Sequence, residues 1–151
     1  MALVASFDNA QPLISSSDHQ LNSNAVLALL RPGLLDLGFQ VEASKASADK
    51  IRVPVLFGRN GRIQKSFDAD AYHEGTRTVL EIEAGRAVDN NQFLKDLFQA
   101  CMMVNVDYLA VAVRMLYRRN PDFERVVTFF DTLYSSRRLA LPLTGVLVIG
   151  Y

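Results

Sequence analysis

The sequence predicts a mixed α/β domain in which a central mixed sheet is flanked by helices. Alternating runs with turn signals between them indicate antiparallel strands in the first half of the chain. Residues 89–104 repeat apolar side chains at helical spacing, and the short apolar runs 108–113 and 145–151 are typical of buried strands. The 151 residues suffice for one full hydrophobic core, so we expect a single domain over residues 1–151.

The N-terminal third is predicted to contain short helices. Residues 2–7 are consistent with either a short strand or a flexible arm. Asn24 is a suitable N-cap for a helix over 25–30, and Pro32 is expected to interrupt it before a second short helix at 34–37. The leucines here cover nearly every helix face, which favours burial or contact with a partner chain. A strand at 39–42 and a polar connection over 43–50 follow.

Three consecutive antiparallel strands are predicted at 51–57, 63–72 and 77–83. Pro54 indicates an edge position or a bulge in the first strand. Asn60-Gly61 is a strong turn signal between the first two strands, and Gly75 supplies positive φ in the loop before the third. A helix from Asp89, a strand at 108–113, a helix over 122–134 and a strand at 145–151 complete the chain.

The hairpin formed by the second and third strands has an acidic face. Pairing residue 72 with residue 77 places Asp68 directly opposite Glu81, with Asp70 and Glu83 on the same side. Like charges opposed at roughly 5 Å destabilise a strand pair. The face is therefore either a solvated surface or a site for a divalent cation, which prefers carboxylate oxygens. A register shifted by two residues makes Asp70 the ligand in place of Asp68.

This hairpin resembles the motif of the PD-(D/E)xK nuclease superfamily, in which an Asp precedes a Glu-x-Lys on the next strand. Asp68 occupies the Asp position, and Glu81-Ile82-Glu83 occupies the Glu-x-Lys position. Phe67 replaces the proline, which varies in the family, and Glu83 replaces the lysine, which resembles the Glu-x-Glu of some type II restriction enzymes. The predicted order of helix, three strands, helix and strand over about 24–114 is similar to the αβββαβ restriction-endonuclease-like core, with a C-terminal helix and strand appended.

The resemblance implies an endonuclease that uses Mg²⁺ or Mn²⁺ to hydrolyse phosphodiester bonds in DNA. It implies that Asp68, Glu81 and the Ile82 carbonyl hold the metal, while Glu83 ligates a second ion or acts as general base. The charge of the missing lysine is expected from Lys95, on the polar stripe of the following helix. Gln92 lies one turn away and would touch the same phosphate or a metal-bound water. A solvated Lys95 and a helix-capping Gln92 are the alternatives.

DNA contacts are expected from basic side chains beside the acidic strand. Arg86 follows that strand closely, and Arg114, with Arg118 and Arg119, follows the next. For the last three, a solvated basic loop is the alternative. His73, in the hairpin loop, is expected to be exposed.

Composition limits the partners. The formal net charge is zero, so no strong overall field attracts nucleic acid or an anionic membrane. No apolar run approaches the ~20 residues of a membrane span, and the N-terminus lacks the pattern of a signal peptide, which indicates a cytoplasmic protein. Because a single cleft cuts one strand, and because the leucine-rich helix offers a surface, we expect a homodimer.

Two other interpretations stay open at this point. One is a catalytically inactive member of the same fold that serves as a nucleic-acid-binding or assembly module, which Glu83 and the neutral net charge favour. The other is an unrelated α/β domain whose acidic hairpin is a solvated face. Divalent-ion binding and metal-dependent cleavage distinguish the three.

Overall fold

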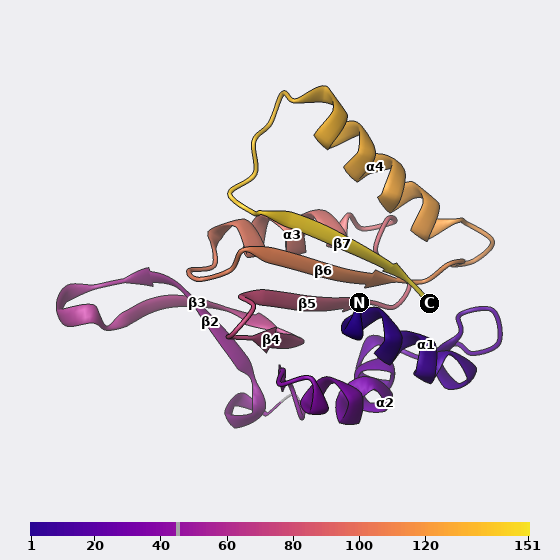
Figure 1. Cartoon of the computed structure of the whole chain (residues 1–151), viewed down its shortest axis with the longest axis horizontal. Helices are drawn as coiled ribbons and strands as arrows, with labels where there is room; N and C mark the ends of the chain where they lie inside the picture. Colours follow the sequence, from indigo (N-terminus) through magenta and orange to yellow (C-terminus); the bar gives the residue numbers. More distant parts are fainter. Residues whose placement is uncertain (45) are drawn as a thin grey trace.

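The computed structural model describes residues 1–44 and 46–151, and Lys45 of the predicted polar connection lies outside them. Within this part of the chain, four α-helices accompany a five-stranded mixed sheet and a separate two-stranded sheet (Figure 1). The prediction of a mixed α/β fold is confirmed. The large sheet has the order β1-β4-β5-β6-β7, formed by Gln40–Val41, Ala71–His73, Thr78–Glu83, Tyr108–Val113 and Gly145–Gly150.

Helices cover both faces of the large sheet. One core lies between the sheet and the N-terminal helices α1 (Ala2–Ile14) and α2 (Ser23–Asp36). The other lies against α3 (Gln92–Met102) and α4 (Asp122–Ser136). Side chains alternate along β5, so Leu80 and Ile82 enter the first core while Val79 enters the second. Glu81 and Glu83 share the face of Val79, which places them on the side of α3.

The sheet is antiparallel at one edge and parallel at the other. β1 pairs with β4 and β4 with β5 in antiparallel fashion, whereas β5, β6 and β7 run parallel. The crossovers that parallel strands require are provided by α3, between β5 and β6, and by α4, between β6 and β7. The predicted strands at 108–113 and 145–151 and the predicted helix from Asp122 are confirmed within one or two residues at each end.

The prediction that the three consecutive strands form one antiparallel meander is wrong. Strands β2 (Ile51–Phe57) and β3 (Ile63–Ala69) pair only with each other and form a separate arm that projects from the body (Figure 1). In the large sheet, the second antiparallel neighbour of β4, besides β5, is β1 instead of β2. The predicted strand 63–72 is divided by a bend at Asp70, so its first part belongs to the arm and its last part to the sheet. The expected bulge is present, with a register shift between Pro54 and Leu56.

The predicted hairpin register is wrong by two residues. Tyr72 lies opposite Val79 rather than residue 77, and Ala71 lies opposite Leu80. The turn is longer than expected because the left-handed conformation falls on Arg77, with φ 54°, and not on the glycine of the loop. The Arg77 amide donates to the Glu74 carbonyl over 3.2 Å, which closes this turn.

The N-terminal region is more helical than expected. Residues 2–14 form α1, with Pro12 inside it, where a strand or arm was expected. Helix α2 begins two residues earlier than predicted, because Asn22 and not Asn24 is the N-cap and accepts the Ala25 amide over 2.9 Å. It continues through Pro32 to Asp36 without the expected interruption. None of the helices in residues 1–44 and 46–151 has the length and apolar character needed to cross a membrane.

Candidate functional site

Asp70 lies at the bend where the chain passes from the arm into the large sheet. Continuing the β4–β5 register by one residue places it opposite Glu81. Its Oδ2 accepts the backbone amide of Ile82 over 2.8 Å, and its carbonyl oxygen accepts the amide of Glu42 at the end of β1. Asp70 is thus fixed between the two neighbouring strands, at the position that the alternative register assigned to the metal ligand.

Glu81 and Glu83 form the acidic centre of the site on β5. Burial is the main reason that the pKa of Glu81 lies well above its usual value, and the negative charges of Asp70 and Asp96 raise it further. Burial also raises the pKa of Glu83, to about 8, with a further contribution from a hydrogen bond to Asp96. The carboxyl groups of β5, the bend and α3 therefore lie close enough to raise one another's pKa.

Asp96 is a member of this cluster that the sequence reasoning missed. It lies on α3, is only 3 % exposed, and its Oδ2 receives no hydrogen bond among the described residues. Burial raises its pKa. The signal was available: Phe93, Asp96, Leu97 and Ala100 follow the i, i+3, i+4, i+7 spacing of the buried face, so an acid occupies a core position.

The predicted cationic residue is close to this cluster. Lys95 lies beside Asp96 on α3, with Nζ 3.5 Å from Asp96 Oδ1, and its side chain is 57 % exposed. Its positive charge opposes the rise in the pKa values of Glu81, Glu83 and Asp96. The Lys95 ammonium group therefore lies beside the acidic cluster and remains accessible to solvent.

A second ion pair lies near Asp70. Lys50 donates to Glu42 Oε2 over 2.9 Å, and Glu42 is buried. This hydrogen bond is the main cause that raises the pKa of Lys50, to which the charges of Asp68 and Asp70 also contribute. Lys50 Nζ lies 3.8 Å from Asp68 Oδ2.

Asp68 itself is placed differently from the expected ligand. It lies in the arm, opposite Arg52 of β2, and its side chain is 53 % exposed. Asp68 precedes Asp70 by two residues, and in the observed register it does not lie opposite Glu81. The structure thus brings together Glu81, Glu83 and Lys95, together with Asp70, while Asp68 lies at their margin.

A pocket of about 520 Å³ adjoins the cluster and is lined by several further predicted residues, whereas Arg118 and Arg119 do not line it. Glu83, Gln92, Arg86 and Arg114 all contribute to its lining. Arg86 is exposed, whereas Arg114 is buried and donates through Nη2 to the Leu21 carbonyl oxygen. Gln92 is the first residue of α3, so its amide side chain enters the pocket from the helix terminus.

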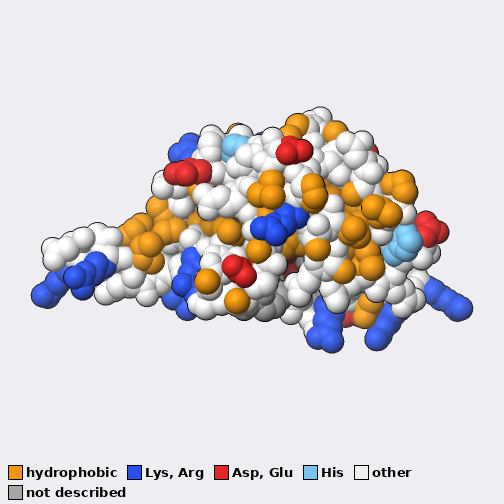
Figure 2. Space-filling model, turned by 90° about the horizontal axis from the view of Figure 1, so that it is seen from below, with side chains coloured by type: hydrophobic (Ala, Val, Ile, Leu, Met, Phe, Trp, Pro, Cys, Tyr) orange, Lys and Arg blue, Asp and Glu red, His pale blue; other side chains and the backbone are white. Residues whose placement is uncertain are grey.

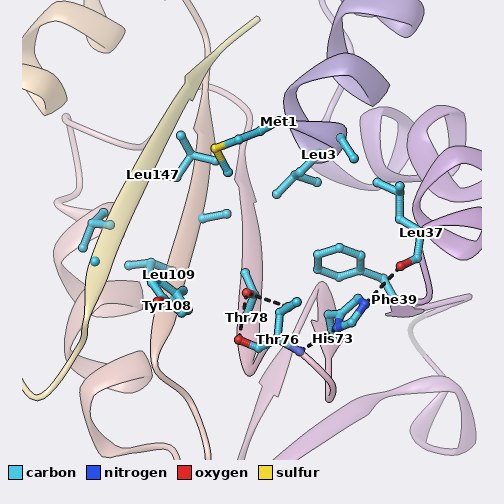
Figure 3. A pocket seen from close by; sticks show the side chains of 14 residues that line it. Met1, Leu3, Leu37, Phe39, His73, Thr76, Thr78, Tyr108, Leu109 and Leu147 are labelled. Carbon is cyan, nitrogen blue, oxygen red and sulfur yellow. Dashed lines mark hydrogen bonds between the residues drawn. The ribbon is translucent and has the colours of Figure 1, made fainter.

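A cavity of about 540 Å³ lies on the opposite face of the sheet (Figure 3). Its lining is mostly apolar and includes Phe39, Leu37 and Tyr108, with no acidic or basic side chain besides His73. Contrary to expectation, His73 is half-buried, and both ring nitrogens are engaged, Nε2 with the Leu37 carbonyl and Nδ1 with the Thr76 amide. The acidic and basic side chains of the candidate site therefore lie on the face of the large sheet that α3 covers.

The donor set of the cluster is suited to a hard divalent cation. Carboxylate oxygens are the preferred ligands of Mg²⁺, and a cation would lower the raised pKa values of Glu81 and Glu83 and satisfy the buried Oδ2 of Asp96. Within residues 1–44 and 46–151, however, no three acidic, histidine or cysteine side chains already have the spacing of a ligand set. The chemistry fits a metal, and binding requires the carboxylates to rearrange.

No family model, curated protein or solved structure matches this chain.

Proposed function

We propose that this protein is a Mg²⁺- or Mn²⁺-dependent endonuclease of the PD-(D/E)xK type that hydrolyses phosphodiester bonds in DNA. The observation that carries the proposal is the juxtaposition of Asp70 with Glu81 and Glu83 across β4 and β5, beside a helix that presents Lys95. The order α2, β1, β4, β5, α3, β6, with β5 and β6 parallel, supports it. It is similar to an αβββαβ core into which the arm is inserted between the first two strands.

In this proposal Asp70 takes the role that the sequence pattern gave to Asp68. Asp70 and Glu81 hold the divalent cation, which supplies charge neutralisation at the phosphate and lowers the pKa of water when bound. Glu83 accepts a proton from the attacking water or contributes to a second ion. Lys95 is the cation that stabilises negative charge on the phosphate, in place of the lysine that Glu83 replaces.

In this proposal the nucleic acid backbone binds in the pocket beside Glu83. Arg86 is exposed there and is free to pair with a phosphate, and Gln92 donates or accepts a hydrogen bond at the start of α3. Arg114 fixes the pocket wall, because its guanidinium bonds the Leu21 carbonyl and stacks over the Tyr117 ring at 5.5 Å.

Cleavage of a panel of plasmid, single-stranded and branched DNA with Mg²⁺ or Mn²⁺ tests the proposal. Glu81→Gln keeps the shape of the side chain but removes a ligand charge, so we expect at least a hundredfold loss of rate, of the order of 3 kcal/mol in activation free energy. Glu124→Gln, which changes an exposed glutamate of α4, is the matched control and should cleave as the wild type does.

The alternatives give different results. Saturable divalent-ion binding without cleavage, lost in Glu81→Gln, would identify a non-catalytic binding module. Absence of both ion binding and cleavage would show that the acidic cluster has a purely structural role and would contradict the proposal.

A further inference from the structure

The arm formed by β2 and β3 carries an excess of positive charge. Its residues 51–69 contain four basic residues, namely Arg52, Arg59, Arg62 and Lys65, and one acidic residue, Asp68, which lies opposite Arg52. Since the whole chain has 16 basic and 16 acidic residues, the remainder holds 12 basic and 15 acidic residues. The neutral net charge therefore conceals a positive arm on an acidic body. Figure 2 shows basic side chains at the end of the narrow projection.

The outer half of the arm is also exposed and apolar. Leu56, Phe57 and Ile63 are 58 %, 50 % and 57 % exposed, whereas the inner residues Val53 and Ala69 are buried in the second core. None of the ion pairs between described residues involves Arg59, Arg62 or Lys65. These three cations, of which Lys65 lies over the Phe67 ring at 5.5 Å, thus stand beside exposed apolar side chains on one surface.

The root of the arm lies at the candidate site. Lys50 directly precedes β2 and contacts the carboxylates of Glu42 and Asp68, and Asp70 directly follows β3. Strands of seven residues at about 3.3 Å per residue reach about 23 Å from that root. A partner that binds along the arm is therefore led to the acidic cluster.

We propose that the arm inserts into the groove of a nucleic acid duplex and guides its backbone to the site. A two-stranded ribbon fits the major groove of B-form DNA, which is about 12 Å wide. Arg59, Arg62 and Lys65 pair with phosphates, and the apolar side chains of Phe57 and Ile63 contact the groove. This inference rests on the proposed function and names its substrate as a duplex.

Charge favours a polyanion over a second copy of this chain. Two arms with the same excess of positive charge repel each other when they pack side by side. A duplex instead carries one negative charge per about 1.7 Å of its axis, which matches an arm that carries cations along its length.

Binding of a short fluorescent duplex, measured by anisotropy in chelator so that no cleavage occurs, tests the proposal. The arm variant is Arg59→Gln/Arg62→Gln. The control, Arg137→Asn/Arg138→Gln, removes two charges from the loop after α4, and Asn tolerates the left-handed conformation at residue 137. For one or two lost phosphate contacts we expect binding to weaken about 8-fold or about 60-fold at 0.1 M salt, and the log–log salt slope to fall by about 0.9 per contact.

Several results would overturn the inference. Equal affinity and salt slope in the arm variant and the wild type would exclude the arm as a phosphate contact, and so would the absence of duplex binding by the wild type. If instead Phe57→Ser/Ile63→Ser dissociates a dimer in sedimentation and Arg59→Gln/Arg62→Gln binds normally, the occupant is a second copy.

Cleavage measured in parallel with Mg²⁺ separates this inference from the proposed function. Arm-dependent binding without any cleavage supports the arm and contradicts the nuclease. Cleavage that is lost in Glu81→Gln but unchanged in the arm variant supports the nuclease and overturns the arm.

Discussion

Replacing Glu83 by Gln should change how the stability of the protein depends on pH. The half-buried Glu83 carboxyl has a folded-state pKa of about 8, against an ordinary value of 4.5. Between these values the folded protein holds a proton that the unfolded chain has released. The free energy of unfolding therefore falls as pH rises from about 5 to about 8, and the stabilisation is fully present only below the ordinary pKa.

The size of the effect follows from the shift. One pKa unit corresponds to about 1.4 kcal/mol, so a shift of this size sets an upper limit of about 5 kcal/mol. Because the side chain keeps part of its contact with water, we expect about 2 kcal/mol of pH-dependent destabilisation. The amide of Glu83→Gln does not titrate, so this part of the pH dependence disappears in the variant.

Urea unfolding in the presence of a chelator, at pH values from about 5 to about 8.5, measures the effect. The quantity to compare is the slope of the free energy of unfolding against pH in the wild type and in Glu83→Gln. Glu124→Gln is the control for removing one exposed carboxyl of α4. Parallel curves for the wild type and Glu83→Gln would refute the reasoning, since they would mean that the carboxyl groups do not converge as described.

Three further variants test the site and its support. Asp70→Asn should weaken calorimetrically measured Mg²⁺ binding at least tenfold while Asp68→Asn leaves it within about twofold, because the observed register brings only residue 70 to Glu81; equal losses would contradict this register. Tyr151→Phe removes a 3.1 Å hydrogen bond to a β5 carbonyl and should cost about 1 kcal/mol in urea unfolding, with no loss if the phenol is instead solvated. Gly85→Ala should destabilise by more than about 1 kcal/mol, because φ is +109° and an added Cβ would overlap the Tyr117 ring; an unchanged melting midpoint would argue against that contact.

The second half of the fold was predictable because its patterns are strong. The runs at 108–113 and 145–151 are short and almost purely apolar, and the α4 sequence repeats its apolar residues every three or four positions. In contrast, α1 buries only Leu3, Phe7 and Ile14, leaves Leu13 exposed and contains Pro12. Such a helix depends on tertiary packing more than on its own sequence.

The acidic site was predictable in composition but not in register. Alternation along the strand places Asp68 and Asp70 on the same face, so periodicity alone does not choose between them. The choice depends on the turn, where Arg77 and not Gly75 adopts positive φ. The bend at Asp70 was also not predictable from the alternation of side chains, which is uninterrupted there. The bend depends instead on the Asp70 side chain, which accepts a hydrogen bond from the Ile82 amide.

The order of strands in the large sheet has a consequence for how this protein is handled. β7 is the last strand, pairs only with β6 among the described residues, and contains no charged side chain in Gly145–Gly150. An uncharged edge of valine, leucine and isoleucine lacks the lysines and prolines that discourage edge-to-edge association. Because β7 follows the α4 crossover, it is the last strand that the chain adds to the sheet. We therefore expect aggregation to begin at this strand when the protein is refolded at high concentration.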